Sequence, residues 1–405
     1  MRAGDSSPWP STFPALGQRV NGHPLAFLDS AATTLRPQSV IDALVEFYST
    51  DNANPSRVHT LASRAADRLS AARQSLARFV NATEPAEIIF VRGTTEGINL
   101  VAGTWGAANL RAGDEIVLSI AEHASNLMPW TRAARQASAL IRVLDVDGDG
   151  RPRLDEFVKL LSERTRIVAL SHVSNVLGYI NPVKEMCALA REVGARTVID
   201  GAQGAPHVKV DVQDIGCDFY VFSGHKMLGP MGTGVVWGRR ELLDDMPPFH
   251  VGSNMAHDVD FEREHLEQGA LKFQAGTPDV AGPVGLAAAV AFFEAAGQNL
   301  HSHDDDLVQY GLERLSEIQG LHLIGPRDAG NRIPVFTFTL DGHPAVKVAQ
   351  VLDARGIAVR AGDLAALPLL RRFGTNEAVR ASAYVYSTRA DLDRLAAALR
   401  ELQGA

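Results

Sequence analysis

One lysine follows an apolar, strand-like segment and stands between a histidine and a run of glycines. The stretch is YVFSGHKMLGPMGTG, residues 220–234, and the lysine is Lys226. An amine at the end of a buried strand loses hydration, so we expect it to have a chemical role. A lysine amine can form a Schiff base with a carbonyl compound, and it can also act as a base.

Other polar residues with chemical potential also follow strand-like segments. Thr94 and Thr95 open a helix in FVRGTTEGIN, where hydroxyls and backbone N–H groups can bind a phosphate at the positive helix end. Open parallel sheets bind ligands at the carboxyl ends of their strands, so these residues are expected to converge. Further members of the set are His123, His172, Asn175, Asp200, Gln203, Ser223 and His225.

A phosphate pocket, a carboxylate, an imidazole and a strand-end lysine together suit pyridoxal 5′-phosphate (PLP). The lysine holds the aldehyde as a Schiff base, the carboxylate keeps the ring nitrogen protonated, and the imidazole stacks on the ring. These residue types therefore predict a PLP enzyme. Lys226 is expected to be the imine nitrogen at rest and a base during turnover. His172 is expected to be a packed, hydrogen-bonded histidine outside the catalytic set.

The elements that must position these residues alternate along the chain. Seven short apolar runs and helical patterns between residues 87 and 237 predict a mostly parallel seven-stranded sheet with helices on both faces. After residue 285 the pattern predicts a smaller α+β domain with an antiparallel sheet. The predicted parts are an N-terminal arm (1–25) packed on the small domain, a large PLP-binding α/β domain (26–285) and a small C-terminal domain (286–405).

Helix boundaries carry local signals. The segment 59–80 has the spacing of an amphipathic helix. Asn181 is expected to cap the helix that follows it, with Pro182 in the first turn. Thr388 and Asp391 are expected to form a capping box for the last helix.

Charge and cysteine content exclude several classes of function. The net charge of −8 argues against a nucleic-acid or anionic-membrane surface. Cys187 and Cys217 provide no disulfide framework, so a cytoplasmic location is expected. Both cysteines are expected to be buried. The first residues lack the apolar segment of a secretory signal, and the apolar stretch 280–296 is expected to be a buried helix.

Several motifs follow one another in the order of a known family. The chain resembles the cysteine desulfurases and selenocysteine lyases of the class V aminotransferase group, which are fold-type I PLP enzymes. The resemblance covers nearly the whole chain. Its motifs are LDSAATTLRP (28–37), RGTTEGINLVA (92–102), SNVLG, DGAQ, FSGHKMLGPMGTG (222–234), FQAGTP (273–278), VRAG (359–362) and VRAS (379–382).

The resemblance implies a role for each candidate residue. Lys226 would carry the Schiff base, His123 would stack on the PLP ring, and Asp200 would pair with the ring nitrogen. The other implied contacts are Gln203 to the ring hydroxyl; Thr95, Ser223 and His225 to the phosphate, with Thr277 from the other subunit of a homodimer; and Arg380 and Asn175 to the substrate carboxylate, with Arg360 as a second, nearby cation.

The sequence departs from the family at one decisive loop. Relatives that form a persulfide carry a Gly-His-His-Cys-Ala-like loop after VRAG, whereas this chain has Asp363, Leu364 and Ala365 there. An alanine cannot attack sulfur. The segment NANPSRVHTL (52–61) also lacks the usual Arg-Gly-x-His spacing, which leaves the roles of Arg57 and His59 open.

The leading expectation is a PLP-dependent C–S or C–Se β-lyase, acting on cysteine or an S-substituted cysteine through a Lys226 aldimine and a quinonoid. A true cysteine desulfurase, which yields alanine and a persulfide, is the first alternative. An aminotransferase or epimerase of the same class is the second.

A non-enzymatic alternative is a calcium-responsive or scaffold protein. The segment DVDGDGRPRLDE (145–156) matches the spacing of an EF-hand loop. However, a strand precedes it instead of a helix, and Pro152 and two arginines do not suit a calcium loop. We therefore expect an acidic turn and no metal site.

Overall fold

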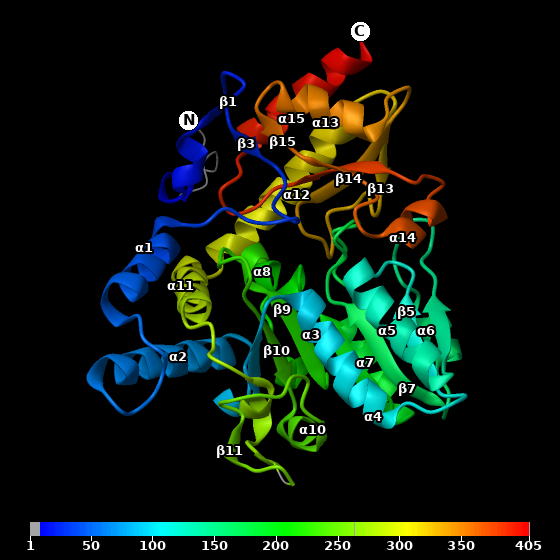
Figure 1. The fold of residues 1–405 in the computed structure, drawn as a ribbon. Helices are drawn as coiled ribbons and strands as arrows, with labels where there is room; N and C mark the ends of the chain where they lie inside the picture. Colours follow the sequence, from blue (N-terminus) through cyan, green and yellow to red (C-terminus); the bar gives the residue numbers. More distant parts are fainter. Residues whose placement is uncertain (1–8, 263, 405) are drawn as a thin grey trace.

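A mostly parallel sheet of seven strands forms the centre of the larger part of the chain (Figure 1). The computed structural model describes residues 9–262 and 264–404. Only β10 runs antiparallel to its neighbours, and the predicted seven-stranded sheet is confirmed. In spatial order the strands are β4 (Ile88–Val91), β10 (Gly234–Gly238), β9 (Phe219–Ser223), β8 (Arg196–Asp200), β7 (Thr165–Ser171), β5 (Glu115–Ser119) and β6 (Leu140–Leu144).

Side chains of the central strands alternate between two hydrophobic cores, one on each face of the sheet. In β5, Ile116 belongs to one core and its neighbour Val117 to the other, because successive side chains of a strand point to opposite faces. The core of Ile116 includes α3 (Thr94–Val101) and α5 (Ala124–Ala137), whereas that of Val117 includes α2 (Thr60–Phe79), α6 (Leu154–Leu160), α7 (Val183–Glu192) and α11 (Ala281–Ala296). Burial on both faces explains why these strands are almost wholly apolar.

Two of the expected helix caps can be compared with the structure. The Asn181 cap is wrong: the turn before α7 has no side-chain cap, and Asn181 Nδ2 instead donates to the carbonyl oxygen of Ser171 at 2.7 Å. The capping box of Thr388 and Asp391 is confirmed at the start of α15 (Arg389–Gln403). The predicted amphipathic helix at 59–80 is α2.

The C-terminal part contains a four-stranded antiparallel sheet covered by helices (Figure 1). Its edge strand β13 was not predicted from the sequence. The strands in order are β13 (Leu321–Ile324), β14 (Val335–Leu340), β17 (Ala378–Ser382) and β16 (Arg360–Gly362). The helices are α12 (Asn299–Ser316), α13 (Ala345–Asp353), α14 (Leu367–Arg372) and α15.

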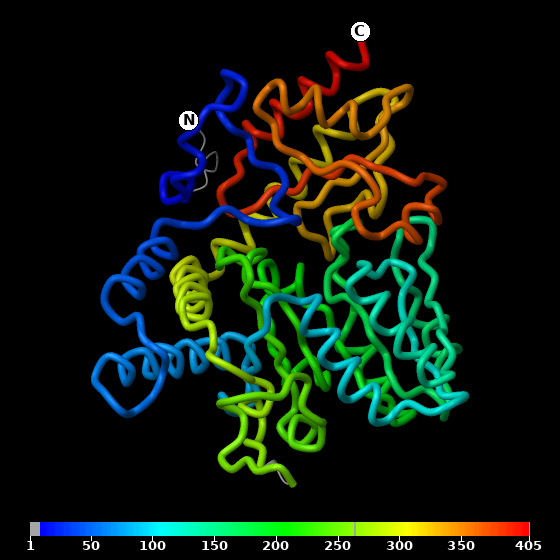
Figure 2. Tube along the Cα trace, viewed as in Figure 1, coloured from blue at the N-terminus to red at the C-terminus, as the bar shows by residue number. Residues whose placement is uncertain are grey.

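The N-terminal segment lies beside the C-terminal part, as the trace in Figure 2 shows. Its strand β3 (Ala26–Phe27) pairs in parallel with β15 (Ile357–Ala358). The ring of Phe13 packs edge-on against Tyr386, with ring centroids 4.8 Å apart. The first eight residues of the predicted arm lie outside the described residues, and the division into three parts remains a prediction.

Shorter elements complete the fold. They are β1 (Arg19–Val20), β2 (His23–Pro24), α1 (Gln38–Glu46), α4 (Ala107–Asn109), α8 (Gly204–His207), α9 (Val212–Ile215), α10 (Arg240–Asp245), β11 (Ala256–Val259) and β12 (Glu264–Leu266). None of the helices in the described part of the chain combines the length and the apolar character needed to cross a membrane.

The acidic segment 145–156 forms a turn that joins β6 to α6. Asp147 Oδ1 accepts hydrogen bonds from the backbone N–H groups of Asp149 and Arg151, both at 2.9 Å. Arg153 pairs with Asp155 at 2.6 Å. The carboxylates of Asp147 and Asp155 are therefore bound by groups of the same turn.

Candidate active site

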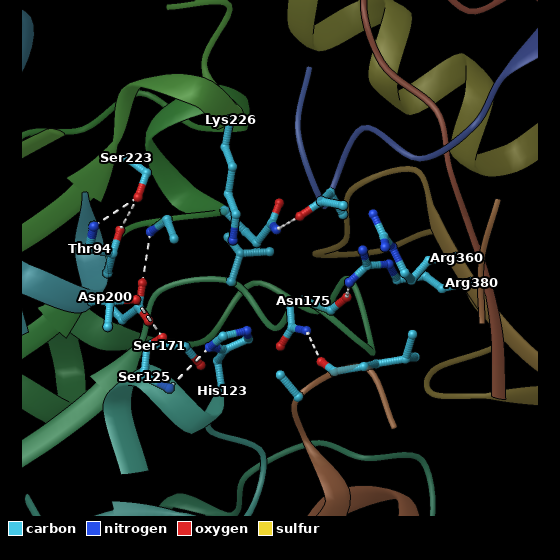
Figure 3. A pocket seen from close by; sticks show the side chains of 18 of the residues that line it. Thr94, His123, Ser125, Ser171, Asn175, Asp200, Ser223, Lys226, Arg360 and Arg380 are labelled. Atoms are coloured by element: carbon cyan, nitrogen blue, oxygen red, sulfur yellow. Dashed lines mark hydrogen bonds between the residues drawn. The ribbon is translucent and has the colours of Figure 1, made fainter. Parts of the chain in front are cut away.

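A cavity of about 470 Å³ lies at the carboxyl ends of β7, β8 and β9, where the C-terminal part meets the large sheet (Figure 3). Ser171, Asp200 and Ser223 end these three strands and line the cavity. The structure gathers all the predicted site residues around it except Thr277. Those residues are Thr94, Thr95, His123, Asn175, Asp200, Gln203, Ser223, His225, Lys226, Arg360 and Arg380.

Lys226 projects into the cavity from a short 3₁₀ turn, Gly224–Lys226, directly after β9. The turn favours glycine at 224, because a Cβ there would stand 3.0 Å from the carbonyl oxygen of Thr233. Burial lowers the pKa of Lys226 to about 8; Asp200 opposes this shift, and Arg380 adds to it. A substantial fraction of the amine is thus neutral near physiological pH, as a nucleophile or base requires.

Asp200 provides a buried negative charge near Lys226. Its Oδ1 accepts the backbone N–H of Ala202 at 2.9 Å. Burial raises the pKa of Asp200, while the Ala202 N–H and the charge of Lys226 oppose that rise. Beyond it, Gln203 Nε2 donates to the carbonyl oxygen of Ala31 at 2.7 Å, which fixes the amide at the cavity wall.

Hydroxyl groups and a helix N-terminus form another corner of the cavity. The Thr94 N–H donates to Ser223 Oγ at 2.8 Å, and Thr94 Oγ1 lies 2.8 Å from the same atom. Thr95 Oγ1 lies 2.7 Å from Ser125 Oγ. Gly93, which precedes the helix, has φ 152°, and a Cβ there would stand 3.1 Å from Ser223 Oγ. This corner can hold a phosphate, because hydroxyls and a helix N-terminus both favour an anion.

His123 is the N-cap of α5 and presents an uncharged ring. Its Nδ1 accepts the backbone N–H of Ser125 at 3.1 Å, so the ring proton resides on Nε2. Burial lowers the pKa of His123 to about 4, helped by repulsion from Lys226 and Arg380 and opposed by Asp363. A neutral, fixed imidazole of this kind can stack on a flat ring.

His225 and His172 occupy different environments. Burial lowers the pKa of His225 to about 4, with added repulsion from Lys226 and Arg36. His172 lies outside the cavity lining and its Nδ1 lies 2.8 Å from the hydroxyl of Tyr220. This is the packed, hydrogen-bonded histidine that the sequence predicts.

Two arginines face each other on paired strands at the other side of the cavity (Figure 3). Arg360 of β16 forms an ion pair with Asp29 at 2.7 Å, and Arg380 of β17 approaches the same carboxylate at 3.7 Å. Burial lowers the pKa of Arg380 to about 10. Among the described residues, the buried Arg380 Nε has no hydrogen-bond partner. A buried guanidinium with an unmet donor can receive a carboxylate.

The loop after Gly362 is firmly attached to the cavity wall. Leu364 and Ala365 both have left-handed backbone conformations, with φ 52° and 53°. Ala365 O accepts the N–H of Ala124 at 2.8 Å, and Leu364 O accepts from Asn175 Nδ2 at 3.0 Å. The side chain of Leu364 is buried in a small apolar cluster. These contacts hold Ala365 where it lines the cavity.

Both cysteines lie away from the cavity. Cys187 is buried in α7, and Cys217 is buried just before β9. Burial raises the pKa of Cys187 to about 12 and raises that of Cys217 well above its ordinary value. Neither is therefore a thiolate near neutral pH.

Three of the remaining residues lie elsewhere. Arg57 pairs with Asp67 at 2.7 Å on the surface. His59 caps α2, its Nδ1 accepting the Ala62 N–H at 3.2 Å. Thr277 is exposed and lines a different pocket of the chain.

Two carboxylates near the cavity, the partly buried Asp29 and the buried Glu122, were not recognised in the sequence. Asp29 lies in the LDSAATTLRP motif, and only the fold shows that it joins Arg360 to Arg380. Glu122 directly precedes His123; its oxygens accept the Ser171 N–H at 3.1 Å and Asn126 Nδ2 at 2.7 Å. Burial raises the pKa of Glu122 to about 8. In the sequence, only the position of Glu122 next to His123 could have indicated that it belongs to the site.

Comparison with known proteins agrees with this geometry. The model of the family described as Aminotransferase class-V matches residues 26–395. The chain belongs to this family. It is 46% identical over 393 residues to a cysteine desulfurase of Synechococcus elongatus, covering 96% of this chain. It is 47% identical over 392 residues to a probable cysteine desulfurase of Halalkalibacterium halodurans, covering 96% of each chain. The aligned part spans 62% of the length of the Synechococcus protein.

A solved structure supports the same fold. The crystal structure of a cysteine desulfurase from Escherichia coli matches with a TM-score of 0.90 and 36% sequence identity, over 98% of this chain and 97% of that one. The predicted fold-type I architecture is therefore confirmed, and so is PLP as the cofactor of the family. The chain is a cysteine desulfurase-like enzyme of the aminotransferase class V family.

Proposed function

We propose that the protein is a PLP-dependent β-lyase that cleaves the C–S bond of cysteine or an S-substituted cysteine. The choice of a lyase rests on one observation. Persulfide-forming relatives present a sulfur-accepting thiol from this loop, and this chain has Ala365 at that position. Ala365 lines the cavity, and both cysteines of the chain are buried elsewhere. The non-enzymatic alternative is not favoured, because the family is enzymatic and the charged groups of the cavity are in place.

The residues around the cavity suit PLP. The hydroxyls of Thr94, Thr95 and Ser223, with His225, would bind its phosphate at the N-terminus of α3. Asp200 would hold the proton of the ring nitrogen, and Gln203 would contact the ring hydroxyl. When bound, PLP supplies an electron-accepting ring next to the α-carbon of the substrate.

The remaining groups of the chain would act on the substrate. Arg380, with its unmet Nε donor, would bind the α-carboxylate, and Arg360 would supply a second positive charge nearby. His123 would cover one face of the ring. Lys226 Nζ would accept the proton from the α-carbon, which its pKa of about 8 permits near neutral pH.

The overall reaction is a redox-neutral elimination followed by hydrolysis. The bond between the β-carbon and sulfur breaks, and sulfur retains both electrons and leaves as a thiol after protonation. One water molecule then converts the three-carbon fragment to pyruvate and ammonia. An S-substituted cysteine and one water thus give pyruvate, ammonia and one thiol.

A true cysteine desulfurase is the second candidate, because the relatives carry that name. Product analysis separates the two functions. The PLP-loaded protein is incubated with L-cysteine and with S-substituted cysteines, and pyruvate, ammonia, thiol, alanine and protein-bound persulfide are quantified. Pyruvate and ammonia in step with the thiol support the lyase. Alanine with a persulfide on the protein contradicts it.

The proposal includes a homodimer in the cytoplasm. Thr277 is exposed and lies outside its own chain's cavity, so a second subunit is needed for it to reach a phosphate, as the resemblance implies. Two unpaired cysteines are consistent with a reducing compartment. Sedimentation of the protein tests the dimer, and the PLP affinity of Thr277→Ala relative to the original protein tests the contribution of this residue to PLP binding.

A further inference from the structure

The loop that lost its thiol has gained a negative charge facing the cavity. Asp363 is exposed and lines the cavity together with His123, and its charge opposes the lowering of the His123 pKa. Within residues 9–262 and 264–404, the Asp363 carboxylate forms no ion pair. We infer that Asp363 selects substrates whose side chain ends in a cationic or hydrogen-bond-donating group; this inference rests on the proposed function.

The position of Asp363 is fixed by its own loop. Its Oδ1 accepts the backbone N–H of Ala365 at 3.0 Å, and its carbonyl oxygen accepts the N–H of Ala366 at 3.0 Å. The next residues are tied to Ala124 and Asn175 by the two hydrogen bonds described above. A carboxylate held in this way can discriminate between ligands, because little ordering is required on binding.

The location of the substrate side chain follows from the proposed contacts of the other groups. With the substrate's α-carboxylate at Arg380 and its α-carbon near Lys226, the substrate side chain would point towards the loop 363–365. In persulfide-forming relatives this loop presents the thiol that takes the substrate's sulfur, so the loop must reach the side chain. Ala365 is small and leaves room there for a substituent on sulfur.

Asp29 partly offsets the positive charges at the other side of the cavity, whereas the Asp363 carboxylate at this wall has no ion-pair partner among the described residues. Arg360 is paired with Asp29 at 2.7 Å, and Arg380 approaches the same carboxylate. His123 is neutral near pH 7, because its pKa is about 4. An ammonium group of the substrate would therefore gain a charge-assisted hydrogen bond from Asp363, whereas a carboxylate at the same place would be repelled.

Three non-cleavable amino acids test the inference by binding alone. L-lysine, L-norleucine and L-2-aminoadipate present a cationic, a neutral and an anionic side chain, and none has a sulfur to eliminate. Their dissociation constants for the PLP-loaded protein are measured by calorimetry. We expect lysine to bind most tightly, and we expect Asp363→Asn to weaken lysine about tenfold while leaving norleucine unchanged. Asp363→Glu should retain part of the preference, and Asp305→Asn, at an exposed site of α12, is the matched control.

The corresponding cleavable series links the preference to turnover. It consists of S-(2-aminoethyl)-L-cysteine, S-propyl-L-cysteine and S-carboxymethyl-L-cysteine, and kcat/KM is measured for each. The inference is supported if kcat/KM is highest for the cationic substrate and lowest for the anionic one, and if this order is lost in Asp363→Asn. Equal binding of the three probes, or a preference that survives in Asp363→Asn, overturns it even if pyruvate forms. A lysine preference lost in Asp363→Asn, together with alanine and persulfide as products, would uphold the specificity and refute the lyase.

Discussion

The pH dependence of PLP capture by the cofactor-free protein follows from the environment of Lys226. Burial lowers the pKa of this lysine from 10.5 to about 8. At pH 7 a group with a pKa of about 8 is about 10% neutral, whereas one at 10.5 is about 0.03% neutral. Because only the neutral amine attacks a carbonyl, Lys226 should capture PLP about 300-fold faster than a solvated lysine of equal reactivity at pH 7.

Stopped-flow absorbance after mixing the cofactor-free protein with excess PLP measures this rate between pH 6 and pH 10. We expect the rate to rise with pH and to level off above a midpoint near pH 8. Lys226→Arg should abolish the signal. Lys184→Ala is the matched control, since Lys184 is exposed and paired with Asp214 at 2.5 Å.

Glu122 also titrates near pH 8, so its contribution must be separated from that of Lys226. In Glu122→Gln the midpoint should remain near pH 8, because the lysine is unchanged. A midpoint close to 10 in both proteins would refute the argument that burial sets the reactivity of Lys226. A midpoint that disappears in Glu122→Gln would assign it to the carboxylate instead.

Three further outcomes are expected. Arg380→Lys should raise KM about 10- to 100-fold for every amino-acid substrate, because an ammonium cannot reproduce the guanidinium geometry; unchanged KM values would contradict the carboxylate contact. Ala365→Cys should yield detectable alanine and a trappable persulfide from L-cysteine, since the loop is held by backbone hydrogen bonds that the change preserves; pyruvate alone would show that a thiol here is insufficient. The folded pKa of Glu122 exceeds its ordinary value, so its contribution to stability falls as pH rises from about 4.5 to about 8. Urea denaturation should therefore show Glu122→Gln more stable, relative to the original protein, at pH 8.5 than at pH 5, and an equal difference at both values would contradict the raised pKa.

Local patterns in the sequence were sufficient for much of the fold and for most of the site. The seven apolar runs identified the strands of the large sheet, because the central strands are buried on both faces and must be almost wholly apolar. Strand-end positions then identified Asp200, Ser223 and Lys226, since parallel strands place their carboxyl ends at one edge. The absence of a thiol at position 365 could also be recognised without the structure, because the sequence shows an alanine there.

Contacts between residues distant in the sequence required the folded chain. Asp29 joins Arg360 and Arg380 across more than three hundred residues, and nothing in its local sequence indicates that pairing. The sequence predicted Asn181 as a helix cap, but in the folded chain its side chain donates to the carbonyl oxygen of Ser171 at the end of β7. The pKa values of Lys226 and Glu122 depend on burial by the assembled domains. Residue types and strand order thus set which chemistry is available, whereas desolvation and long-range pairing set the charge state of each group.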